Sequence, residues 1–103
     1  MFLPAGTSLR KTAVEYGLTY NELLDFNDMK PTEKLAANQV LFLQEKKKKG
    51  ADKTHQVQKG ETVWMISQQE GIRLDKLLDY NHLSASSKLK AGQTLYLKGH
   101  GPK

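Results

Sequence analysis

The chain has 103 residues, a formal net charge of +5 and no cysteine, so neither disulfides nor a thiolate metal site can stabilise its fold. No apolar run approaches the roughly 18 residues that a membrane helix needs, and we expect no membrane insertion. The first residues, MFLPAG, lack the charged flank and long apolar stretch of a signal peptide, and we expect the chain to be a piece of a longer protein.

The first elements along the chain are a short strand, a turn and a helix. Residues 2–4 have an extended pattern, and Gly6 lets the backbone turn sharply after them. Ser8 lies where a hydroxyl caps the exposed amides of a helix start, and Gly17 offers the left-handed conformation that ends a helix. We therefore predict a strand at residues 2–4 and a helix at residues 9–16.

A second helix and a closing strand follow. Thr19 and Glu22 have the spacing of a capping box, in which the hydroxyl and the carboxylate satisfy each other's backbone donors. Asn27 suits the exit from this helix because asparagine tolerates left-handed backbone and bonds to nearby peptide groups. Residues 41–43 alternate as in a half-buried strand. The order is strand, helix, helix, strand.

The positive charge is concentrated in the next segment. Residues 46–54, KKKKGADKT, contain five lysines and one aspartate, and they have no apolar periodicity. Such a segment is predicted to be a solvated linker that repels itself. The alternative is that its lysines attract anionic wall polymers or nucleic acid.

The rest of the chain repeats the first part. Residues 6–45 align with residues 60–99 without a gap, and the identical pairs include Gly6/Gly60, Gly17/Gly71, Leu23/Leu77, Asn27/Asn81, Leu41/Leu95 and Leu43/Leu97. We divide the chain into a first repeat (1–45), a basic linker (46–54), a second repeat (55–99) and a tail (100–103). Each repeat, at roughly 45 residues, is near the lower size limit for independent folding. The predicted fold class is α+β.

The second repeat resembles the LysM family in the stretches KGETVWMIS, QQEGI, LLDYNHLS and KLKAGQTLYL. The resemblance implies β-α-α-β modules, each with a two-stranded antiparallel sheet and both helices packed on one face. It also implies non-catalytic binding of glycans that contain N-acetylglucosamine, above all peptidoglycan. The first repeat is similar but departs from the pattern at Thr7, Ser8, Arg10 and Asn38.

The resemblance further implies that the sugar chain lies in a shallow groove between the first turn and the loop after the second helix. In the second repeat these walls are Gly60, Glu61, Thr62 and Val63, and Asn81, Leu83, Ser84, Ala85 and Ser86. In the first repeat they are Gly6, Thr7, Ser8 and Leu9, and Asn27, Met29, Lys30 and Pro31. Several of these residues have structural roles of their own, as turn glycine or helix cap. Trp64 is either a platform for sugar stacking or part of the core.

The functional expectation is a monomeric tandem module that tethers a larger bacterial protein, such as a peptidoglycan hydrolase whose C-terminal part it forms, to the cell wall. Its place is then the periplasm, the cell wall or the exterior. We expect no catalytic residue, metal or cofactor, because the histidines have neither ligand spacing nor a nucleophile beside them.

Two alternatives remain open. One is a protein-interaction or assembly module that has lost glycan binding. The other is a nucleic-acid binder, which the distribution of basic residues disfavours, because they cluster in the linker and not along a helix. We therefore expect no nucleic-acid partner.

Overall fold

The computed structural model describes residues 1–100, and the chain divides into two compact units. We call Met1–Lys46 module 1 and Lys47–Lys103 module 2. Of the predicted tail, only His100 lies among the described residues. Within that part of the chain no helix is long and apolar enough to cross a membrane.

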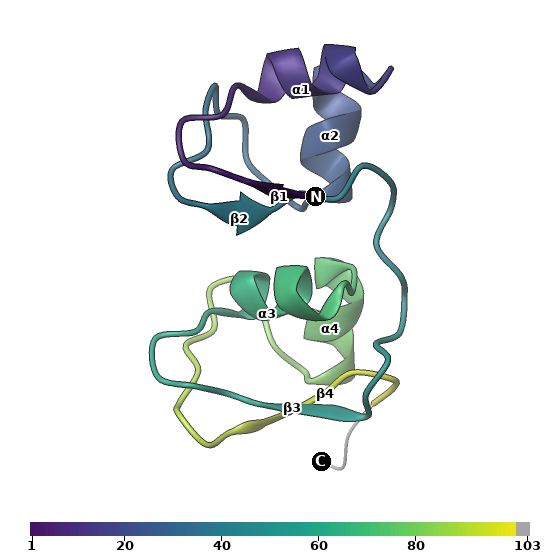
Figure 1. Ribbon diagram of the computed structural model, residues 1–103. Helices are drawn as coiled ribbons and strands as arrows, with labels where there is room; N and C mark the ends of the chain where they lie inside the picture. Colours follow the sequence, from purple (N-terminus) through teal and green to yellow (C-terminus); the bar gives the residue numbers. More distant parts are fainter. Residues whose placement is uncertain (101–103) are drawn as a thin grey trace. The chain divides into compact units, whose positions relative to one another are not determined.

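Both modules have the predicted order of strand, helix, helix, strand, which confirms the α+β fold class (Figure 1). Module 1 contains β1 (Phe2–Leu3), α1 (Leu9–Glu15), α2 (Tyr20–Phe26) and β2 (Gln39–Val40). Module 2 contains β3 (Thr54–Gln56), α3 (Val63–Glu70), α4 (Leu74–Tyr80) and β4 (Thr94–Tyr96). Each sheet is a single antiparallel pair, β1 with β2 and β3 with β4, and in each module both helices lie on one face of the sheet.

The helices begin and end at the predicted signals. Ser8 Oγ accepts a hydrogen bond from Lys11 N at 3.3 Å, and the capping box of Thr19 and Glu22 is formed in both directions. Gly71 ends α3 with a φ of 68°, a left-handed conformation that costs glycine little. These short-range contacts fix the lengths of the helices.

The predicted closing strands are displaced. Module 1 was expected to pair through residues 41–43, whereas β2 is Gln39–Val40. The pairing reaches Leu41, whose N–H donates to Met1 O at 2.8 Å and whose carbonyl accepts from Met1 N at 3.0 Å. It ends there because Phe42 N turns to the side chain of Asn27. In module 2 the residues equivalent to 41–43 are 95–97, and the observed β4, Thr94–Tyr96, overlaps them at residues 95–96.

Each module has its own hydrophobic core between the helices and the sheet. In module 1 the core contains Leu9, Ala13, Leu23, Leu24, Leu35 and Leu41. In module 2 it contains Val57, Val63, Ile66, Ile72, Leu77, Leu95 and Leu97. The core of module 1 is thinner, because Thr12 stands where module 2 has Ile66 and turns its hydroxyl to Ser8 O at 2.8 Å.

Most residues of the segment 46–54 are exposed, as its lysines indicate, but its backbone is hydrogen-bonded to the fold. Lys47 N donates to Gly71 O at 3.0 Å, and Gly50 N donates to Leu97 O at 2.8 Å, so the segment from Lys47 onward is part of the fold of module 2. Gly50 itself is buried. The cause is that these bonds use backbone groups, which the exposed side chains of Lys47, Lys48 and Lys49 leave available.

Lys46 departs furthest from the expected solvation. Its side chain is fully buried, with Nζ 2.9 Å from Asp28 Oδ2 and 5.8 Å from the centre of the Phe42 ring. The lysine therefore closes module 1, and the boundary between the two units falls directly after it.

Candidate functional site

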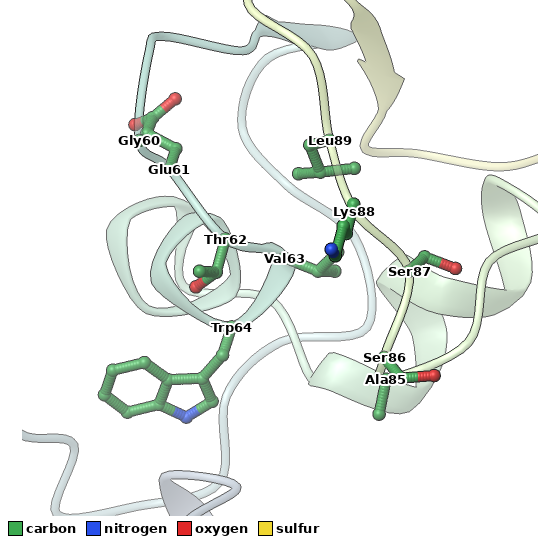
Figure 2. A pocket seen from close by; sticks show the side chains of 10 residues that line it. All are labelled: Gly60, Glu61, Thr62, Val63, Trp64, Ala85, Ser86, Ser87, Lys88 and Leu89. Atoms are coloured by element: carbon green, nitrogen blue, oxygen red, sulfur yellow. The ribbon is translucent and has the colours of Figure 1, made fainter.

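Module 2 contains a groove of about 450 Å³ between the turn after β3 and the loop that follows α4 (Figure 2). One wall is formed by the turn and the first residues of α3, and the other by an extended segment that leads towards β4. The lining residues are Gly60, Glu61, Thr62, Val63, Trp64, Ala85, Ser86, Ser87, Lys88 and Leu89.

The groove brings together six of the nine residues predicted for the second repeat, from Gly60 to Val63 and from Ala85 to Ser86. It adds residues 87–89, which sequence reasoning missed although two of them are identical in the first repeat. It also includes Trp64, which is half-buried and whose indole points away from the opposite wall. The sequence signal for Lys88 and Leu89 was their identity to Lys34 and Leu35.

Asn81, predicted as a contact, lies outside the groove lining and joins the end of α4 to β4. Its Nδ2 donates to Leu77 O at 2.8 Å and to Tyr96 O at 2.9 Å, and its Oδ1 accepts from Tyr96 N at 2.6 Å. Asn27 makes the matching bonds in module 1 and is fully buried. Both side chains are therefore used inside the fold.

The two remaining predicted residues of module 2 support the second wall from outside the lining. Leu83 is packed against the core. Ser84 and Ser87 close a turn on themselves, because Ser84 N donates to Ser87 Oγ at 3.0 Å and Ser87 N donates to Ser84 O at 3.0 Å. This turn keeps the wall compact.

The carboxylate of Glu61 belongs to an ionic cluster with His55 and Glu70. Nε2 of His55 lies 2.9 Å from Glu61 Oε1, and Nδ1 of His55 lies 2.8 Å from Glu70 Oε2. The His55 side chain is only 10% exposed. The cluster ties together β3, the turn and the end of α3.

The cluster shifts two pKa values. Burial disfavours the imidazolium of His55, but the hydrogen bonds to Glu61 and Glu70 outweigh burial and raise the pKa of His55. Burial likewise favours the neutral carboxyl of Glu61, but hydrogen bonds from His55 and from Gln58 N outweigh it and lower the pKa of Glu61. Glu61 and Lys88 are the two charged side chains among the residues that line the groove.

The groove thus offers backbone peptide groups, the hydroxyls of Thr62, Ser86 and Ser87, and apolar surface from the half-buried Leu89. Such a surface suits a neutral polar ligand that carries amide and methyl groups. Among residues 1–100 no group of three or more histidine, cysteine or acidic side chains is placed to hold a metal ion.

In module 1 the corresponding walls are in direct contact. Gly6 N donates to Leu35 O at 2.8 Å, Leu35 N donates to Thr7 O at 3.0 Å, and Leu9 N donates to Glu33 O at 3.1 Å. These bonds flank a bridge between Ser8 and Lys34.

Of the other predicted contacts in module 1, Leu9 is fully buried and Met29 packs against the core, while Lys30 and Pro31 are exposed.

The family model described as LysM domain matches residues 5–44 and 55–98. The probable endopeptidase p60 of Listeria grayi is 40% identical over 45 residues, which cover 44% of this chain and 9% of that protein.

Two solved structures are also similar. The spore cortex-lytic enzyme SleL of Bacillus cereus aligns with 98% of this chain and 22% of its own, at 31% identity and a TM-score of 0.44. SleL of Bacillus megaterium QM B1551 aligns with 100% of this chain and 23% of its own, at 16% identity and the same TM-score of 0.44. The chain thus spans less than a quarter of each of these relatives.

Proposed function

Because the chain belongs to the LysM domain family, whose members generally bind peptidoglycan and other N-acetylglucosamine glycans, we propose that it binds such a glycan without turning it over. The observation that carries the proposal is the open groove of module 2, with its peptide groups, small hydroxyls and apolar floor.

The chemistry of the ligand fits this lining. An N-acetyl group presents one N–H donor, one carbonyl acceptor and one methyl group, and a pyranose ring adds hydroxyls around an apolar face. Backbone groups of Gly60 and Leu89 are suited to the amide, and the side chain of Leu89 to the methyl group. The hydroxyls of Thr62 and Ser86 are suited to the ring.

We further propose that the module tethers a larger cell-wall protein to its substrate, in the periplasm, in the wall or outside the cell. The relatives named above include a probable endopeptidase and cortex-lytic enzymes, and the chain matches only a small part of each. A hydrolase is therefore the proposed parent protein, and this chain its binding part.

The test is co-sedimentation of the chain with insoluble peptidoglycan. Ala85→Trp places a large side chain at an exposed position of the groove, and Ala91→Trp places the same side chain at an exposed position outside its lining. We expect Ala85→Trp to lose sedimentation and Ala91→Trp to retain it, with soluble N-acetylglucosamine oligomers competing. Equal sedimentation of both variants would contradict the groove, and no sedimentation of the native chain would contradict the function.

A further inference from the structure

We propose that module 2 carries the only open glycan groove of the pair, and that a latch built on Tyr20 keeps the matching groove of module 1 shut. The identity of the ligand rests on the proposed function. The latch itself can be tested without any ligand.

The first step is a set of backbone hydrogen bonds between the two walls of module 1, which we call the clasp. Three hydrogen bonds join Gly6, Thr7 and Leu9 to the segment 33–35, with a bridge from Ser8 to Lys34 between them. The peptide groups that would meet an N-acetyl group are therefore already paired with each other.

The second step is the contrast with module 2. The matching pairs there are Gly60 with Leu89, Glu61 with Leu89, and Val63 with Ser87, and their members lie on the two walls of the groove. Within residues 1–100, none of these three pairs forms the hydrogen bond that the equivalent pair forms in module 1. Two modules of one fold thus present the same walls in a closed and an open arrangement.

The third step is the cause of closure. The hydroxyl of Tyr20 donates to Thr32 O and accepts from Thr32 N, both at 2.8 Å. Arg10 stacks over the Tyr20 ring, 4.1 Å from its centre, and its Nε lies 3.5 Å from Glu33 Oε1. Tyr20 and Arg10 therefore hold residues 32 and 33 against the helices. This keeps the segment 33–35 beside the turn to which its backbone is hydrogen-bonded.

Module 2 lacks the chemistry for this latch. Leu74 stands in place of Tyr20 and has no hydroxyl, and Trp64 stands in place of Arg10 and has no guanidinium. Ser86 and Ser87 occupy the positions of Thr32 and Glu33, and the Ser84–Ser87 turn bonds to itself instead of to the opposite wall.

A glycan entering module 1 must first break the clasp, so we expect it to bind there roughly tenfold or more weakly than to module 2. The chain then binds one glycan stretch per molecule. The avidity of two equal sites is not available to it.

The test is amide hydrogen exchange of the full chain by NMR, without ligand. We expect the amides of Gly6, Leu9 and Leu35 to be protected, and those of Gly60 and Leu89 to exchange at least tenfold faster. Equal exchange in the two sets would overturn the clasp.

The latch is tested by Tyr20→Phe, which removes only the hydroxyl. Tyr16→Phe is the matched control, because Tyr16 lies in the same module and its hydroxyl contacts Met1 Sδ. We expect Tyr20→Phe alone to reduce the protection of Leu9 and Leu35. Unchanged protection would overturn the role of Tyr20.

A titration of the same samples with N-acetylglucosamine oligomers separates this inference from the proposed function. Shifts confined to module 2 in the native chain, and extended to module 1 in Tyr20→Phe, support both. Shifts in both modules of the native chain overturn the closure. Shifts in neither module overturn the proposed function, while the exchange pattern still decides whether the clasp exists.

Discussion

Asn81→Ala distinguishes a residue that holds the fold from one that contacts the ligand. The substitution removes three hydrogen bonds, from Nδ2 to Leu77 O and Tyr96 O and from Tyr96 N to Oδ1. At about 1 kcal/mol each, their loss lowers the free energy of unfolding of module 2 by about 3 kcal/mol. A domain of this size is stabilised by only about 3 to 8 kcal/mol, so the effect is a large fraction of the whole.

The assay is denaturant unfolding followed by tryptophan fluorescence, because Trp64 is the single tryptophan of the chain and reports on module 2. Asn27→Ala is the matched control: it removes the equivalent bonds in module 1 and is expected to leave the Trp64 transition in place. An Asn81→Ala variant that unfolds at the native midpoint but no longer binds glycan would refute the structural role.

Two further changes test the ionic cluster and the segment after Lys46. Because the pKa of His55 is raised in the fold, its contribution to the stability of module 2 is complete below the ordinary pKa of roughly 6.5 and is lost as the pH rises through the higher folded pKa. The pKa of Glu61 is lowered, so its contribution to stability is lost as the pH falls through the folded pKa. The unfolding midpoint reported by Trp64 should therefore decrease as the pH is raised above about 6.5, and His55→Met should abolish this decrease. A native midpoint that does not change with pH in this direction would contradict the cluster. Gly50→Ala places a Cβ 3.0 Å from Ile72 Cδ1 and should destabilise module 2 by about 1 to 3 kcal/mol, whereas Ala51→Gly, at an exposed neighbouring position, should cost less than 1 kcal/mol. Equal stability of these two variants would contradict the packing of Gly50 and favour a linker that is solvated throughout.

The elements that the sequence predicts well are those whose signals lie within a few residues. The hydroxyl of Ser8 and the capping box of Thr19 and Glu22 act on amides three positions away, and Gly71 needs only its own backbone freedom. Each signal is local, so each can be recognised in the sequence without knowledge of the tertiary fold.

The segment 46–54 could not be predicted in the same way. Its attachment to module 2 depends on the backbone N–H groups of Lys47 and Gly50, and a backbone group carries no sequence signal. The burial of Lys46 depends on Asp28, which is eighteen positions earlier and left-handed at φ 51°. Charge pattern alone indicates solvation because it does not report partners distant in sequence.

The roles of the site residues show a different limit. Both repeats have an asparagine at the same position, which fits a residue that contacts the ligand as well as one that bonds a helix to a strand. Only the hydrogen-bond distances around Asn27 and Asn81 show the structural role. The closure of the groove in module 1 likewise could not be predicted by aligning the two repeats. The clasp consists of backbone groups, and the latch depends on the hydrogen bonds between Tyr20 and Thr32.

The most direct measurement is an amide chemical-shift titration of the whole chain with N-acetylglucosamine oligomers. The account predicts shifts at Gly60, Val63 and Ser86 of module 2, and none at Leu9 and Leu35 of module 1 at the same ligand concentration. No shift at Gly60, Val63 and Ser86 at millimolar ligand would contradict the claim that the groove of module 2 binds the glycan.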